Sequence, residues 1–279
     1  GFIGSNLIEI ARAKSWFVEN LDYSDKSEFP VDITQVVWDD FDLSGFDAVI
    51  HLAALISVPE SFEDPEKYSR INVEATEGLF SACVDQGVNR VIFASSASVY
   101  GSSNRKTNSV LDDASPESPY AETKLAGEEL ARKFASKKTS FTVFRFFNVY
   151  GRGQKGDSPY ASVIPKFVRL VCNDEAIIIE GDGLQTRDFI HVSDVGKTLL
   201  SACSSIPKRN FEIINLGTGD ATSIIDFAHL LLRIVKEEGQ NSESKITHAQ
   251  SRAGDIRDSI ADLSELDEYA DPKSFLPFE

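Results

Sequence analysis

Apolar runs alternate with segments of helical apolar spacing along the first half of the chain. The strand-like runs lie at 16–19, 36–38, 47–54, 90–96 and 141–147. Helical spacing follows Gly1, spans 64–86 and continues from Tyr120 to about Ser136. Strands that alternate with helices are typical of a parallel sheet covered on both faces. The pattern therefore predicts an α/β fold with a doubly wound parallel sheet, whose carboxyl edge is where such sheets bind ligands.

The second half of the chain has a different pattern of residue types. Beyond Gly153, Gly, Pro and polar residues separate short elements at 164–171, 176–180, 194–204 and 223–238. We expect a larger domain over 1–151, to which 188–216 returns. A smaller α/β region, formed by 152–187 and 217–279, is expected to cap the ligand.

Composition narrows the class of protein. The chain of 279 residues has 42% hydrophobic residues and a formal net charge of −16, which disfavours nucleic acid and anionic membranes as partners. Its 3 Cys and 4 His show no metal-ligand spacing, so we expect reduced thiols, no metal and a cytoplasmic location. There is no Met, and Gly1 stands inside a glycine motif. We therefore expect the first strand and first glycine of the sheet to be missing from this chain.

The N-terminal glycines indicate a dinucleotide site. Gly1 and Gly4 precede a helical pattern, as in the second half of a Gly-x-Gly-x-x-Gly or Gly-x-x-Gly-x-x-Gly loop, so Gly1, Phe2, Ile3 and Gly4 are expected along the pyrophosphate. Glu19, followed by Asn20, stands roughly 20 residues after the missing glycine, where an acid holds a ribose 2′-hydroxyl. Such a carboxylate repels the 2′-phosphate of NADP and favours NAD. The alternative is an ordinary surface glutamate.

Tyr120 and Lys124 are the strongest catalytic candidates. Residues four apart share a helix face, so Lys124 is expected to lower the pKa of the Tyr120 phenol and make it a base for a sugar hydroxyl. The pair alone is a weak signal, because Tyr and Lys are also ordinary helix-surface residues.

Further motifs occur in a fixed order along the chain. In chain order they are Gly-Phe-Ile-Gly-Ser-Asn-Leu at 1–7, His-Leu-Ala-Ala at 51–54, Asn72-Val73, Ser95 to Gly101, Ser118 to Lys124, Arg145 to Gly151, Gly181-Asp182-Gly183, Arg187-Asp188-Phe189, Asn215 to Gly219, and Gly254 to Arg257. With these motifs the chain resembles the extended short-chain dehydrogenase/reductase family, and within it the nucleotide-sugar 4-epimerases.

The resemblance implies a Rossmann domain with bound NAD and a transient 4-keto sugar. Tyr120 would remove the O4 proton while the nicotinamide takes the C4 hydride, and Ser96 would share that proton. Lys124 would also reach the nicotinamide ribose. Without the family, Ser96 would be a strand-end hydroxyl that caps a turn.

The resemblance also assigns the remaining contacts. Those implied for the cofactor are Leu52, Ala53, Ala54, Asn72, Ser95 and Phe147, besides Tyr120 and Lys124. Those implied for the substrate are Ser96, Asn148, Ser162, Val163, Arg187, Arg252, Asp255 and Ser259. Asn72 would support the site through its amide, or be a helix-surface residue. The arginines would grip a pyrophosphate, or neutralise Asp188 and Asp255.

Three positions separate the subfamilies. Ala97-Ser98 replace the Asp-Glu pair of a 4,6-dehydratase, so dehydration is disfavoured. Ser259 aligns with a gate beside the sugar C2 group, and its small size predicts UDP-N-acetylglucosamine and UDP-N-acetylgalactosamine as substrates, beside UDP-glucose and UDP-galactose. Glu180 replaces an aromatic residue that stacks on uracil.

The sequence leaves alternative functions open. They are a UDP-glucuronate decarboxylase, another dehydratase of the family, or a protein that binds NAD and a nucleotide sugar without turnover. A homodimer through the helices at 64–86 and 119–136 is also expected from the family.

Overall fold

A parallel sheet forms the centre of the molecule. The computed structural model describes residues 1–25, 27–102, 105–156, 162–239, 243–251 and 256–278. The sheet contains β3 (Ala48–His51), β4 (Arg90–Ser96), β5 (Ser140–Phe146) and β10 (Phe211–Leu216), in the order β10-β5-β4-β3 and all parallel. The predicted α/β class with a Rossmann-like parallel sheet is confirmed. Its register sets Ser96 opposite Phe146, so the carboxyl ends of the central strands meet at one edge.

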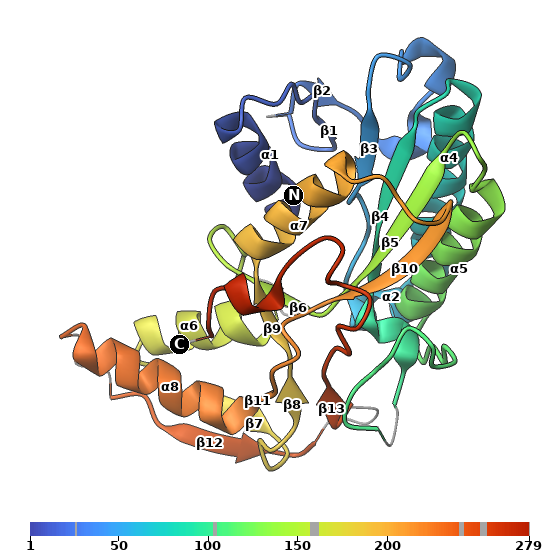
Figure 1. Cartoon of the computed structure of the whole chain (residues 1–279). Helices are drawn as coiled ribbons and strands as arrows, with labels where there is room; N and C mark the ends of the chain where they lie inside the picture. Colours follow the sequence, from blue (N-terminus) through green and yellow to red (C-terminus); the bar gives the residue numbers. More distant parts are fainter. Residues whose placement is uncertain (26, 103–104, 157–161, 240–242, 252–255, 279) are drawn as a thin grey trace.

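Helices cover both faces of this sheet (Figure 1). α4 (Ala75–Asp85) and α5 (Pro119–Phe134) pack on one face with Val91, Phe93 and Phe141. α1 (Phe2–Ala13) and α7 (Val192–Ser204) pack on the other face with Ile92 and Phe144. Successive strand residues point to opposite faces, so the unbroken apolar run of β4 supplies both cores.

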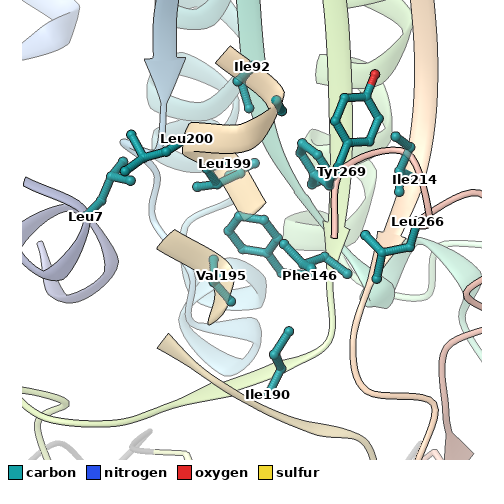
Figure 2. Close-up of a cluster of buried hydrophobic side chains, with 14 of the residues drawn as sticks. Leu7, Ile92, Phe146, Ile190, Val195, Leu199, Leu200, Ile214, Leu266 and Tyr269 are labelled. Atoms are coloured by element: carbon teal, nitrogen blue, oxygen red, sulfur yellow. The ribbon is translucent and has the colours of Figure 1, made fainter. Parts of the chain in front are cut away.

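Figure 2 shows the core beneath α1 and α7. Leu7 from α1 and Val195, Leu199 and Leu200 from α7 meet the strand residues Ile92, Phe146 and Ile214. Leu266 and Tyr269 close the cluster from the C-terminal segment. The segment after residue 260 is therefore packed into the same core as the first helix.

The predicted helix at 64–86 is built from consecutive pieces. α2 (Val58–Glu63) and α3 (Pro65–Ser69) lead into a π-helical turn, η3 (Arg70–Glu74), which continues as α4. A π turn widens the helix by one residue per turn and often marks a functional position. Here it contains Asn72.

Smaller elements lie beyond the carboxyl edge of the sheet. Their bounds are β6 (Asn148–Tyr150), α6 (Val163–Cys172), β7 (Ile177–Glu180), β8 (Thr186–Arg187), β9 (Phe189–His191), β11 (Thr222–Ser223), α8 (Ile224–Glu237), β12 (Ile246–Ala249), β13 (Asp258–Ser259) and η5 (Pro272–Ser274). A separate apolar cluster joins α6, α8 and β7. The four short elements expected at 164–171, 176–180, 194–204 and 223–238 are all present, whereas the domain boundaries stay predictions.

Two predicted strands are wrong. Residues 16–19 are not a strand, and 36–38 lead into the 3-10 turn η2 (Trp38–Asp40), after η1 (Ile33–Gln35). A strand needs a neighbour for its ladder, and among the described residues β3 pairs only with β4. The short pair β1 (Leu21–Asp22) and β2 (Phe29–Pro30) forms its own sheet after residue 20.

Candidate active site

Tyr120, Lys124 and Ser96 meet at the carboxyl edge of the sheet. Ser118 caps α5 by accepting from the Ala121 amide at 3.2 Å, and Pro119 occupies the first turn, which fixes where the helix begins. Tyr120 is 8% exposed and Lys124 4% exposed. Ser96 ends β4, and its hydroxyl acts on the Tyr120 phenol. The sequence-predicted trio is therefore brought together in a buried site.

The pKa of Tyr120 moves in the direction opposite to the prediction. Burial raises the pKa of Tyr120 above its ordinary value, and the Ser96 hydroxyl opposes that rise. The Lys124 ammonium instead donates to the Ala94 carbonyl at 2.9 Å and lies 6.0 Å from the centre of the Tyr120 ring. In the protein alone, Tyr120 is thus a protonated phenol at neutral pH.

Lys124 is itself close to losing its proton. Burial lowers its pKa to about 8, and the Glu128 carboxylate opposes this effect. Its Nζ also lies over the Phe93 ring, 5.2 Å from the centre, where the ring's negative face favours the cation. Lys124 therefore changes charge within the pH range of an ordinary assay.

Asn72 joins the strand end to the catalytic helix. Its Oδ1 accepts from the Leu55 amide at 2.8 Å, and its Nδ2 donates to the Leu55 carbonyl at 2.9 Å. Nδ2 also donates to Thr123 Oγ1 at 3.0 Å, and that hydroxyl donates to the Tyr120 carbonyl at 2.7 Å. Asn72 is 2% exposed, so it is a clamp between the loop after β3 and the first turn of α5.

The glycine segment offers free backbone donors. α1 begins at Phe2 after Gly1, and within this fully described helix no side chain caps the N-terminus. Such an end attracts phosphate groups. A Cβ placed at Gly4 would lie 3.8 Å from Leu52, so the glycine segment and the end of β3 are neighbours. These residues, with exposed Ala53, fit the pyrophosphate side of NAD.

The other cofactor candidates fall into two groups, one exposed or partly exposed and one with side chains that point inward. Glu19 is exposed, with Asn20 and Ala54 partly so, and the Asn20 amide donates to Glu28 at 2.9 Å. The side chains of Ser95 and Phe147 point inward: the Ser95 hydroxyl donates to Glu128 at 2.5 Å, and Phe147 packs near Tyr100. For these two residues, only the backbone atoms are available to contact a cofactor.

Several substrate candidates gather around β8. Arg187 and Ser259 are Cα partners across the β8–β13 ladder. Arg187 Nη1 donates to the Thr186 and Ile256 carbonyls at 2.8 Å each. The amide of Asn148 donates to the carbonyl of Asp188, the residue that follows β8, at 2.9 Å, and Asn148 pairs with Phe189 of β9.

Other substrate candidates lie elsewhere or outside the described residues. Ser162 accepts from Gln154 Nε2 at 2.9 Å and stands at the start of α6, next to Val163. Arg252 and Asp255 lie outside the described residues. Within the described part of the chain, no group of three or more His, Cys, Asp or Glu side chains can hold a metal ion.

A buried ion pair next to the site was not predicted. Glu128 accepts from Arg145 Nε at 2.9 Å and from Nη2 at 2.7 Å, with both side chains at most 5% exposed. The Arg145 guanidinium lies 4.6 Å from the centre of the Tyr100 ring, whose hydroxyl donates to Asn215 at 2.6 Å. The sequence contains two signals for this pair. Arg145 stands inside an apolar strand, and Glu128 follows Tyr120 by eight residues in the same helix.

His51 gives a prediction about acid stability. Its Nε2 lies 2.9 Å from Thr76 Oγ1, which donates to the Asn72 carbonyl, so neutral His51 must be the donor to Thr76. Burial lowers the pKa of His51 from 6.5 to about 3. The unfolded chain therefore binds a proton first, and stability should fall as the pH drops below 6.5. The expected loss is about 2 kcal/mol between pH 6.5 and pH 5.

The control for this prediction is His51→Gln, whose amide can still donate to Thr76 and does not titrate. Urea unfolding at pH 7 and pH 5 should show a smaller pH difference in the variant than in the native protein. Equal pH differences in the two proteins would show that His51 does not contribute to acid instability.

Comparison with known proteins identifies the family. The profile described as NAD dependent epimerase/dehydratase family matches residues 1–217. A UDP-N-acetyl-alpha-D-glucosaminuronate decarboxylase of Bacillus cytotoxicus is 32% identical over 89% of this chain and 80% of its own length. Among solved structures, the UDP-N-acetylglucosamine 4-epimerase from Methanobrevibacter ruminantium, in complex with UDP-N-acetylmuramic acid, gives a TM-score of 0.88 at 32% identity, covering 99% of this chain and 90% of that one.

A second solved structure contains the cofactor. MoeE5 in complex with UDP-glucuronic acid and NAD is 35% identical, with a TM-score of 0.84 and coverage of 96% of this chain and 89% of that one. The predicted family, the predicted NAD cofactor and the predicted enzyme class are confirmed. With the Tyr120, Lys124 and Ser96 site in place, the chain belongs to the NAD dependent epimerase/dehydratase family.

Proposed function

We propose that this protein is a 4-epimerase of UDP-sugars that accepts UDP-N-acetylglucosamine and UDP-N-acetylgalactosamine. The observation that carries the proposal is the placement of Tyr120 and Lys124, both buried, beside the partly buried Ser96 at the carboxyl edge of the sheet. Ala97 and Ser98 follow Ser96 without an acidic side chain, which favours epimerisation over loss of water.

In this mechanism the side chains transfer one proton and orient the sugar hydroxyl from which it is taken. Bound NAD supplies a hydride acceptor for C4, and its oxidised ring carries a positive charge that favours the Tyr120 phenolate. Tyr120 takes the O4 proton as the C4–H bond breaks, which gives a 4-keto sugar. Ser96 donates to O4 and fixes its direction. After the sugar turns over, Tyr120 would return the proton to O4, and bound cofactor would supply the hydride to the other face of C4.

Lys124 has a supporting part in this scheme. Its charged amine lies beside the phenol and is anchored on the Ala94 carbonyl. A cation there lowers the cost of forming the phenolate in a buried site. The substrate's nucleoside diphosphate is assigned to Arg187, Asn148, Ser162 and Val163, together with Arg252 and Asp255. The sugar C2 group is assigned to the space beside Ser259.

The size of Ser259 gives a specificity prediction. Ser259→Tyr should lower kcat/KM for UDP-N-acetylglucosamine by about 100-fold while leaving that for UDP-glucose within about threefold, because a phenol occupies the space of the acetamide. Competition between the two sugars in one reaction measures the ratio directly. Ser264→Tyr, a change in the turn after β13, is the control. An unchanged substrate ratio in Ser259→Tyr would show that Ser259 does not set the sugar specificity.

A second candidate is 4-epimerisation of a UDP-uronic acid. The hydroxyl oxygen of Ser98 is buried and has no hydrogen-bond partner among the described residues, and its amide donates to Ser96 Oγ at 3.2 Å. A buried hydroxyl without a partner is costly, and a sugar carboxylate would satisfy it. MoeE5, to which the chain is similar, binds UDP-glucuronic acid.

One assay separates these substrates. UDP-N-acetylglucosamine, UDP-glucose and UDP-glucuronic acid are each incubated with the protein without reductant, and the anomeric protons are followed by NMR. A mixture of UDP-N-acetylglucosamine and its C4 epimer is expected. Turnover of UDP-glucuronic acid alone would favour the second candidate. Inertness of all three would support a non-catalytic protein.

The assembly and location stay predictions. We propose the homodimer through helices 64–86 and 119–136, and sedimentation should give twice the monomer mass. The cytoplasmic location is likewise proposed and is testable by cell fractionation. Within the described residues no helix is long and apolar enough to cross a membrane.

A further inference from the structure

Glu128 lies at the junction of α5, β4 and β5. Its carboxylate accepts from the Ser95 hydroxyl at 2.5 Å and from two nitrogens of Arg145. Ser95 and Arg145 are Cα partners in the β4–β5 ladder. Glu128 is 1% exposed, so one side chain of the catalytic helix fixes the same rung of two central strands.

This rung is next to the point where Lys124 is anchored. Lys124 precedes Glu128 by four residues, as Tyr120 precedes Lys124, so all three share a face of α5. The Lys124 ammonium donates to the carbonyl of Ala94, whose neighbour Ser95 donates to Glu128. Glu128 therefore holds the peptide segment that receives the Lys124 hydrogen bond.

Other ionisable groups around Lys124 supply less charge. The Lys124 charge acts on His51 of β3, but His51 is itself neutral near pH 7, because burial lowers its pKa to about 3. Tyr120 is neutral while its proton is in place. On the outer elements, Glu60 pairs with Lys67, and Glu77 of α4 pairs with Lys133 of α5, at the surface. The buried carboxylate that acts on Lys124 is Glu128, with Arg145 behind it.

We propose that Glu128 is a positioning residue for the proton transfer: it fixes the Lys124 amine on β4 and keeps that amine charged beside Tyr120. Its significance for catalysis rests on the proposed function, in which Tyr120 is the base. Arg145 has the opposite influence, because it neutralises the carboxylate that supports the Lys124 charge. The two partners of one ion pair should therefore change Lys124 in opposite directions when each is removed.

The test follows the titration of Lys124 directly. Protein labelled with carbon-13 at lysine Cε is titrated by NMR, and the Lys124 signal is the one lost in Lys124→Arg. The native midpoint is expected at about 8. Glu128→Gln should lower the midpoint by about one unit, and Arg145→Met should raise it by a smaller amount, because Arg145 lies behind Glu128. Glu77→Gln, which breaks the exposed pair between α4 and α5, should leave it unchanged.

Both Glu128→Gln and Arg145→Met loosen the same ion pair. A merely structural role would therefore shift the Lys124 midpoint in the same direction in both variants, not in opposite directions. Equal midpoints, or shifts in the same direction, would overturn the proposal. Should either single variant fail to fold, Glu128→Gln/Arg145→Met removes both charges and is expected to titrate below the native protein. An unchanged midpoint there would also overturn it.

The role of Glu128 and the proposed function can be contradicted independently of each other. The NMR measurement needs no turnover, so absence of epimerisation would not alter the result for Glu128. In an active enzyme, the alkaline limb of the kcat/KM profile should move with the Lys124 midpoint. A uniform loss of rate with unmoved limbs would contradict the positioning role while leaving the epimerase proposal intact.

Discussion

Tyr120→Phe is expected to lower kcat for epimerisation by about 10³-fold with little change in KM. The phenol hydroxyl is the group that exchanges the O4 proton, and general acid–base groups of this kind contribute on the order of 10²–10⁴-fold. The ring is buried and remains in the variant, so the shape of the site is kept. Steady-state rates with UDP-N-acetylglucosamine, together with thermal stabilisation by NAD, measure chemistry and cofactor binding separately.

A matched control is available for this change. Tyr269 donates to Glu212 at 2.5 Å in the core beneath α7, so Tyr269→Phe removes one buried hydroxyl away from the site. It should lower stability and leave kcat within about twofold of the native value. If Tyr120→Phe retained more than a tenth of the native rate, Tyr120 would not be the base.

Breaking the Glu128–Arg145 pair is expected to have the largest effect on stability. Removing one partner leaves an uncompensated charge in a buried site, which costs about 3–5 kcal/mol. Arg145→Met also exposes the Glu128 carboxylate to an apolar setting, while Glu128→Gln leaves the guanidinium beside Tyr100. Urea unfolding of each single variant should show this loss as a lower midpoint at an unchanged slope.

The double variant separates charge from packing. Because Glu128→Gln/Arg145→Met removes both charges and keeps similar volumes, it should recover most of the lost stability. Lys133→Met, which breaks the exposed pair with Glu77, should change the free energy of unfolding by less than about 1 kcal/mol. Additive losses in the double variant would mean that the two side chains do not act as a pair.

The elements with strong local signals were predictable. β4 and the helix that holds Tyr120 and Lys124 lie within one or two residues of their expected bounds, since a long apolar run and a capped helix are local features. The strands expected at 16–19 and 36–38 failed because a strand depends on its neighbour, and pairing is not visible in a single apolar run.

The candidate site was predictable in composition but not in electrostatics. The spacing of Tyr120 and Lys124 correctly placed both on one face of α5, yet it could not reveal that both are buried. Burial reverses the expected direction of the Tyr120 pKa. Likewise, Ser95 is on the predicted strand, but its hydroxyl points to Glu128, a contact that joins residues 33 positions apart.

The most direct test of the account uses UDP-N-acetylglucosamine carrying deuterium at C4. If a hydride leaves C4 and returns within one site, the UDP-N-acetylgalactosamine product should retain the deuterium in full, with no lasting accumulation of NADH. Two results would contradict epimerisation through a 4-keto sugar. One is loss of the deuterium to solvent during conversion, and the other is a product whose configuration at C4 is unchanged.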